Sequence, residues 1–109
     1  MIGFGQVNIE KTYYENGNLK SEITVNNNDK SDGSAKLYYE SGKLRTKGFF
    51  KEGKEHSIWS IYYENGKLKI ESEWNDGNPN GTWKYYDEKG QLIKISEYLN
   101  CELIEEKWL

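Results

Sequence analysis

The chain has 109 residues, enough for one domain or a short repeat array, and a formal net charge of −3 at pH 7. This balance gives no basic field to attract nucleic acid, and no apolar run reaches the length of a membrane span. Charged residues make up 30% of the chain, but aromatic residues reach 15% and recur at a fixed period, which argues against disorder.

The start of the sequence lacks the basic residues and apolar stretch of a signal peptide. The single cysteine, Cys101, rules out an internal disulfide framework and fits a reducing compartment. We therefore expect a cytoplasmic protein.

One eight-residue motif recurs along the chain. It reads "YYENGNLK" from Tyr13, "YYESGKLR" from Tyr38, "YYENGKLK" from Tyr62 and, more loosely, "YYDEKGQL" from Tyr85. Its glycines follow at intervals of 25, 24 and 24 residues, at Gly17, Gly42, Gly66 and Gly90. The extra residue of the first interval falls in the polar stretch 26–33, which matches the stretch 75–81, and insertions belong in loops. The sequence therefore predicts a structural repeat.

Within one unit the apolar residues alternate with polar ones, as in two half-buried strands. Before the turn, Trp59, Ile61 and Tyr63 share one parity, and after it Leu68 and Ile70 alternate with charged residues. An Asn-Gly pair between such runs favours a two-residue type I′ turn, here Asn65-Gly66, with Asn16-Gly17 and Ser41-Gly42 as its equivalents. This turn predicts three strand pairs: Tyr63 with Leu68, Ile61 with Ile70, and Trp59 with Ser72.

The last unit departs from this pattern. Ile93 and Ile95 have the wrong parity, which indicates a β-bulge at Gly90. The tail 99–109 fits an amphipathic helix, but Trp108 lies close to the tryptophan position of a fifth unit, which favours a strand.

The pattern G-x-x-x-G-x-W-x-x-Y in "GNPNGTWKYY", together with "YYENGKLK", resembles the bacterial variant of the MORN repeat. It also resembles the MORN-type antitoxin of a bacterial toxin–antitoxin module. The resemblance runs from about Glu10 to Tyr98, with Ser57 in place of a glycine and Ala35 in place of a tryptophan. It implies an all-β fold, an elongated single antiparallel sheet of four to five stacked hairpins. We expect residues 1–109 to form one such array, with a C-terminal partial unit at 99–109.

The sequence offers no catalytic set, and we expect neither an enzyme nor a bound cofactor or metal. His56 and Cys101 lie almost two repeats apart, about four strands of ~4.8 Å each, too far for a nucleophile and its base. The stretch 26–33 looks faintly like a calcium loop, but Lys30 occupies a ligand position, so a turn rich in Asn and Asp is favoured.

One set of side chains is a candidate protein-binding surface, which we call the tyrosine strip. Its tyrosines share the face opposite Trp59 and Trp83, and basic residues are expected across the hairpin from three of them. The strip comprises Tyr13, Tyr38, Tyr62 and Tyr86, with Lys20, Arg45 and Lys69. Tyr and Arg anchor many protein interfaces, but packing of these side chains within the sheet is the more ordinary explanation.

These observations favour a non-enzymatic protein-interaction module, of which an antitoxin or immunity-like protein that masks a toxin is one form. The alternative is a peripheral membrane or cell-envelope adaptor, against which the net acidity and the scattered basic residues count. The sequence leaves the oligomeric state open.

Overall fold

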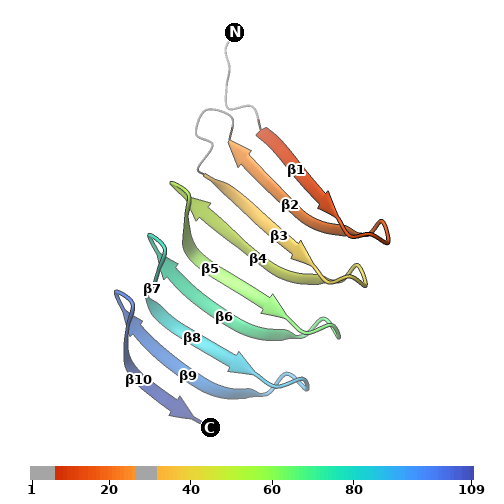
Figure 1. Cartoon of the computed structure of the whole chain (residues 1–109). Coiled ribbons are helices and arrows are strands. Elements are labelled where there is room, and N and C mark those ends of the chain that lie inside the picture. Colours follow the sequence, from red (N-terminus) through yellow and green to blue (C-terminus); the bar gives the residue numbers. More distant parts are fainter. Residues whose placement is uncertain (1–6, 27–31) are drawn as a thin grey trace.

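The computed structural model describes residues 7–26 and 32–109, and these form one antiparallel sheet of ten strands (Figure 1). The strands are β1 Val7–Tyr13, β2 Leu19–Asn26, β3 Gly33–Tyr38, β4 Leu44–Lys51, β5 Lys54–Tyr62, β6 Leu68–Asn75, β7 Asn78–Pro79, β8 Gly81–Tyr86, β9 Leu92–Leu99 and β10 Glu102–Trp108. Each strand pairs with its sequence neighbours, except that β6 pairs with both the short β7 and β8. The predicted all-β fold is confirmed, and the tail is a strand, β10.

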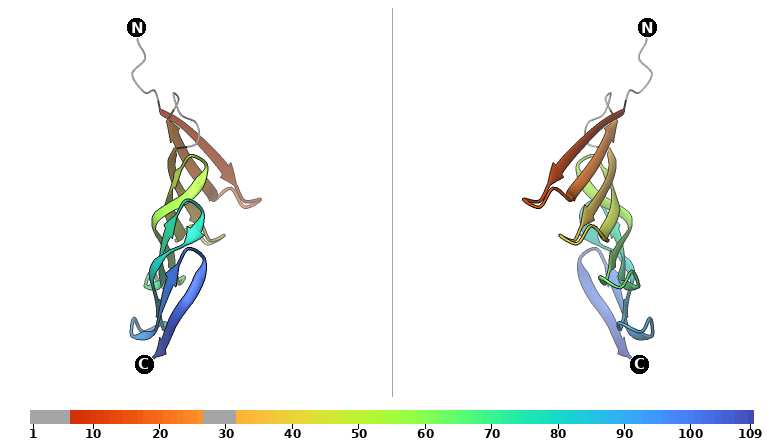
Figure 2. Two further views of the ribbon diagram at one scale, coloured as in Figure 1. Left: turned by 90° about the vertical axis from the view of Figure 1, so that its left-hand side faces the viewer. Right: turned by 90° about the vertical axis from the view of Figure 1, so that its right-hand side faces the viewer.

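The sheet is a single layer. Its principal extents are 54 × 36 × 18 Å, and the edge-on views show a twisted ribbon of strands with no second layer over the described residues (Figure 2). Among those residues Ala35 is the one buried hydrophobic side chain, 3% exposed. None of the described elements is a helix long and apolar enough to cross a membrane. Stability must therefore come from strand pairing and from contacts between side chains that cross strands on each face.

The turns that carry the repeat glycine have three residues, so the predicted type I′ turn is wrong. In the third unit the Gly66 N–H donates to the Tyr63 carbonyl at 2.9 Å, and the Tyr63 N–H donates to the Lys67 carbonyl at 2.9 Å. Gly66 has φ +88° and Asn65 is not in the left-handed region, whereas type I′ needs both. The glycines of the other three turns make the equivalent bond, at Gly17, Gly42 and Gly90.

A β-bulge next to each of these turns restores the register. Tyr62 pairs with Leu68 and Ile61 with Ile70, which leaves Lys69 without a partner residue. The predicted pair of Tyr63 with Leu68 is therefore wrong, while the pairs Ile61–Ile70 and Trp59–Ser72 are confirmed. The irregularity expected at the fourth turn is common to all four units, whose bulged residues are Lys20, Arg45, Lys69 and Ile93.

Type I′ turns do occur, at the opposite end of the strands. Both residues of each turn have positive φ: 53° and 77° at Glu52-Gly53, 50° and 81° at Asp76-Gly77, and 48° and 75° at Asn100-Cys101. The stretch 75–81, expected to be a loop, therefore contains a tight turn and the strand β7.

Candidate interaction surface

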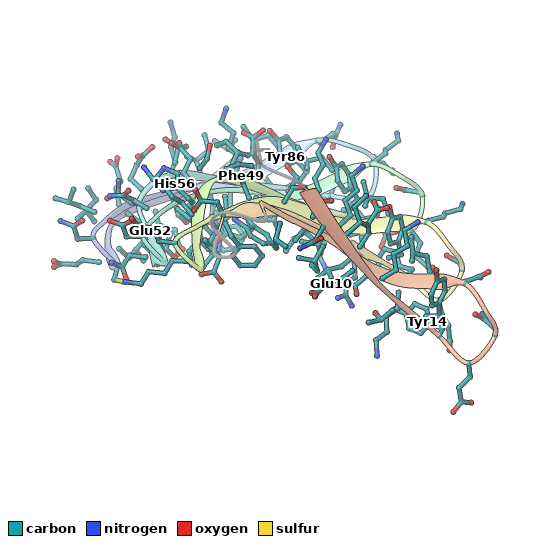
Figure 3. All side chains as sticks on the ribbon, turned by 90° about the horizontal axis from the view of Figure 1, so that it is seen from above. Glu10, Tyr14, Phe49, Glu52, His56 and Tyr86 are labelled. Atoms are coloured by element: carbon teal, nitrogen blue, oxygen red, sulfur yellow. The ribbon has the colours of Figure 1, made fainter. Side chains whose placement is uncertain are left out.

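Strand pairing divides the side chains between two faces. Trp59 opposite Ser72 and Trp83 opposite Ser96 lie on what we call the tryptophan face. Lys36 opposite Lys47 lies on the other, the lysine face. Figure 3 shows Phe49, His56 and Tyr86 on the lysine face, with Glu10 and Tyr14 on the opposite side.

The indole rings on the tryptophan face lie across neighbouring strands. Trp59 Nε1 donates to the Phe49 carbonyl at 3.1 Å, and Trp83 Nε1 donates to the Glu73 carbonyl at 2.9 Å. A Cβ atom at Gly48 would sit 1.9 Å from a carbon of the Trp59 ring, so only glycine leaves room for this indole.

The same arrangement buries polar residues without a second layer. Ser96 is 0% exposed, and Ser72 is also buried, since it lies between the Trp59 and Trp83 strands. The Ser72 hydroxyl donates to the Trp59 carbonyl at 3.0 Å and accepts from Trp74 Nε1 at 2.9 Å. The indole N–H groups of Trp59, Trp74 and Trp83 are therefore satisfied within the sheet.

The aromatic rings of this face also contact one another. Ring centroids lie 5.0 Å apart for Phe50 and Trp59, 5.2 Å for Trp74 and Trp83, and 5.1 Å for Trp83 and Tyr98. Such pairs contribute about 0.5–1.5 kcal/mol each beyond the area they bury. The tryptophan face thus replaces the core that a single layer lacks.

Tyr85 belongs to the same cluster, at 6.5 Å from the Trp83 ring. Burial raises the pKa of the Tyr85 phenol, and the neighbouring Tyr98 phenol raises it further. The Lys94 ammonium lies 4.1 Å from the Tyr85 ring centroid and 4.6 Å from that of Trp108, which ties β10 to the rest of this face.

A second set of tyrosines links each repeat to the next. The hydroxyl of Tyr14 donates to the Tyr38 carbonyl at 2.6 Å. The same bond joins Tyr39 to Tyr62 at 2.6 Å, and Tyr63 to Tyr86 at 2.7 Å. We call Tyr14, Tyr39 and Tyr63 the staple tyrosines.

The fourth turn has Asp87 at the staple position. Its carboxylate accepts from the backbone N–H groups of Lys89 and Gln91, at 2.9 and 3.0 Å. These bonds hold the pKa of Asp87 below its ordinary value, so the residue caps its own turn rather than a neighbouring repeat.

The predicted tyrosine strip lies on the lysine face, at the ends of β1, β3, β5 and β8. The residues opposite Tyr13, Tyr38, Tyr62 and Tyr86 are Leu19, Leu44, Leu68 and Leu92. Tyrosine and leucine therefore alternate across eight strands in one apolar row. Tyr13 is 59% exposed and the other three tyrosines are partly exposed.

The basic residues assigned to the strip are not opposite its tyrosines, and that part of the prediction is wrong. Lys20, Arg45 and Lys69 are the bulged residues. The Lys20 ammonium lies 5.6 Å from the Tyr14 ring centroid, and the Lys69 ammonium 5.4 Å from that of Tyr63. These two lysines therefore pack on staple tyrosines.

Sequence reasoning missed two hollows on the lysine face. One is lined by Lys43, Leu44, Tyr62, Asn65 and Gly66, beside the middle of the strip. The other is lined by residues of β3, β4 and β5, among them Lys36 and Lys47. The two-residue turn predicted at Ser41-Gly42 already places these two lysines opposite each other, so the pair could have been found from the sequence.

The residues considered for chemistry lie apart. His56 pairs with Phe49 within the sheet, whereas Cys101 lies in the β9–β10 turn with its thiol 3.0 Å from Asn78 Oδ1. Within residues 7–26 and 32–109 no group of three His, Cys, Asp or Glu side chains could hold a metal ion. Most of the calcium-like stretch 26–33 lies outside the described residues.

Comparisons with known proteins agree with this architecture. A solved structure titled "Crystal Structure of TarM" is similar with a TM-score of 0.58 at 14% identity, over 97% of this chain but only 20% of that one. A comparison with curated proteins gives no significant match. The family model described as "MORN repeat variant" matches four times, at residues 6–27, 31–52, 55–76 and 79–100. Because these matches cover most of the chain, the protein belongs to the MORN repeat variant family.

Proposed function

We propose that this chain is a non-enzymatic, cytoplasmic protein-interaction module that binds its partner through the tyrosine strip of the lysine face. MORN repeats in general serve as interaction modules for proteins or membranes. A protein partner is favoured over a membrane because the row is partly exposed and built from tyrosine and leucine, on a chain of net charge −3.

The observation that carries this proposal is the alternating row of tyrosine and leucine side chains. Its eight residues lie on eight adjacent strands, which makes the row about 34 Å long at ~4.8 Å per strand. A standard protein interface buries about 800 Å² per partner, and a row of this length can supply its apolar centre. The staple hydrogen bonds hold successive repeats in place, so little conformational entropy is lost when a partner binds.

A narrower form of the proposal is an antitoxin or immunity-like protein. The resemblance of the repeated motif to a bacterial antitoxin supports it. In this role the lysine face would cover the surface through which a toxin acts, and the chain itself would need no catalytic residue.

The test compares two double substitutions on opposite faces. Tyr38→Ala with Tyr62→Ala should abolish capture of a partner by the immobilised chain, because truncation of a central anchor typically costs about 2 kcal/mol or more of binding. The melting temperature should fall only modestly. Trp59→Ala with Trp83→Ala should chiefly lower the melting temperature, because these rings replace the core.

The narrower proposal has its own measurement. The captured partner, expressed alone, should arrest bacterial growth, and co-expression of this chain should restore it. If the tyrosine pair lowers stability as much as the tryptophan pair and every partner stays bound, the strip is structural and the proposal fails.

A further inference from the structure

Two lysines face each other at the centre of the lysine face. Lys36 on β3 is directly opposite Lys47 on β4. Like charges at such positions destabilise a sheet, and elsewhere in the same row the charges are paired, as in the Lys11–Glu22 ion pair at 3.8 Å. Neither Lys36 nor Lys47 makes an ion pair within the described part of the chain. Glu22 of β2 lies opposite Lys36 on the other side, but its ion pair is with Lys11. In an acidic protein, the two adjacent lysines are therefore a positive site without an ion-paired partner among the described residues.

The two lysines border a hollow of about 290 Å³. Its lining also includes two serines, Ser34 and Ser60, two large hydrophobic residues, Phe49 and Ile58, and the small residues Ala35 and Gly48. Phe49 is 48% exposed and Ile58 is 41% exposed, although both lie near the middle of the sheet. The hollow therefore combines two ammonium groups, hydroxyl groups and an apolar wall.

We propose that this hollow binds an acidic side chain of a protein partner, with a neighbouring apolar residue of the partner against Phe49 and Ile58. Two ammonium groups match the two oxygens of a carboxylate, and charge-assisted hydrogen bonds are about twice as strong as neutral ones. The bound carboxylate also removes the repulsion between Lys36 and Lys47. Binding and folding of β3 and β4 are thus favoured together.

The hollow and the tyrosine strip share the strands β3, β4 and β5, with Tyr38, Leu44 and Tyr62 in the adjacent row. The inference therefore rests on the proposed function and specifies the chemistry of the partner: an acidic group beside apolar anchors. A lipid surface fits less well, because Glu71, Glu73 and Glu97 lie on the same face towards β9 and would repel anionic headgroups.

The test uses synthetic peptides as probes. A peptide of alternating Glu and Leu is titrated into the ¹⁵N-labelled protein, with the Gln-for-Glu peptide as its uncharged match. We expect saturable shifts of the β3 and β4 amides with the Glu peptide, about tenfold weaker binding with the Gln peptide, and loss of affinity as salt is raised.

Two substitutions separate binding from folding. Lys36→Glu places a carboxylate opposite Lys47 but also opposite Glu22, so the melting temperature should change little while binding of the Glu peptide weakens about tenfold or more. Lys47→Gln removes one of the two like charges, and Ser60 is its other cross-strand neighbour, so it should weaken binding while the melting temperature rises slightly. Lys84→Glu, in the same row but outside the hollow, is the control for the change of charge. It places a second carboxylate opposite Glu71 and should lower the melting temperature, but it should leave peptide binding unchanged.

Equal affinity for the Glu and Gln peptides, or equal affinity of the Lys36→Glu and Lys84→Glu variants, overturns the inference. So does sedimentation with phosphatidylserine vesicles in the absence of peptide binding, which would instead assign the lysines to a membrane. A captured partner that depends on Tyr38 and Tyr62 but is retained by Lys36→Glu refutes this site alone. If the Glu peptide binds at the hollow but the immobilised chain captures no protein partner, the proposed function is refuted and the binding site for the carboxylate is not.

Discussion

The staple tyrosines give the sharpest test of how the repeats hold together. Tyr63→Phe removes one hydroxyl, which donates to the Tyr86 carbonyl of the next repeat at 2.7 Å, and leaves the ring in place. The net contribution of such a bond is about 0.5–1.5 kcal/mol, and the partly buried carbonyl left without its donor favours the upper half of that range. For a domain of this size, 1 kcal/mol corresponds to a shift in melting temperature of roughly 4–8 °C. We therefore expect Tyr63→Phe to melt about 4–12 °C below the unmodified protein.

The adjacent residue provides a matched control. Tyr62 lies on the opposite face, and its hydroxyl makes no hydrogen bond in the described part of the chain. Tyr62→Phe should therefore change the free energy of unfolding by less than about 0.5 kcal/mol. Urea unfolding followed by circular dichroism measures both variants, and an unchanged m-value shows that the same surface is exposed. Equal stability of the two variants would refute the staple.

The staple also predicts additivity. Tyr39 and Tyr63 are in successive repeats, two strands and about 10 Å apart, and they donate to different carbonyls. The double change to Phe should therefore lower the free energy of unfolding by the sum of the two single effects, within about 0.5 kcal/mol. A much larger loss would mean that the staples act as one cooperative network.

Three further outcomes follow from the backbone at Ser57 and Gly81 and from the fourth turn. Ser57 has φ +64°, and the residue at the same position of the next repeat is Gly81. Ser57→Gly should therefore raise the free energy of unfolding by about 0.5–1 kcal/mol in the same urea assay. A loss of stability would contradict this account. Gly81→Ser should lower it by more, because φ is +97° and a Cβ atom would lie 2.8 Å from the Glu73 carboxylate. The lowered pKa of Asp87 means that its carboxylate stabilises the fold above the ordinary aspartate pKa of 3.8, and that this contribution is lost as the pH falls through the lower folded value. Asp87→Asn can still accept a turn hydrogen bond but cannot titrate, so its melting temperature should depend less steeply on pH in the acid range, and parallel pH profiles would refute the assignment.

The strands could be predicted from the sequence because the alternation of apolar and polar residues is the same for every turn that keeps the same residues paired across the hairpin. A three-residue loop shifts the register by one residue, and a one-residue bulge shifts it back. The pair Ile61–Ile70 is therefore the same for a two-residue turn as for the loop and bulge together. Parity alone could not choose between them, and Asn65-Gly66 also suits the three-residue loop, which needs positive φ only at its last residue.

The errors in the candidate site have the same origin. Tyr38 and Tyr62 lie before the bulge, so their face was predicted correctly. Lys20 and Lys69 are themselves the bulged residues, and only the structure shows that they turn towards the staple tyrosines. The Lys36–Lys47 pair lies beyond the bulge, where the register is normal again, and it was overlooked rather than hidden.

The fit of the Trp59 ring over Gly48 determines at which turns a repeat of this chain can be excised, duplicated or grafted into another array. The indole and the glycine that makes room for it lie on β5 and β4, which are joined by the type I′ turn Glu52-Gly53. Trp83 and the β6 strand on which it leans are joined in the same way through Asp76-Gly77. A gene duplication or a graft with ends in the three-residue loops keeps each bulky ring with its small neighbour, whereas ends in the type I′ turns separate them. The transferable module is therefore offset by one strand from the hairpin that the sequence motif marks.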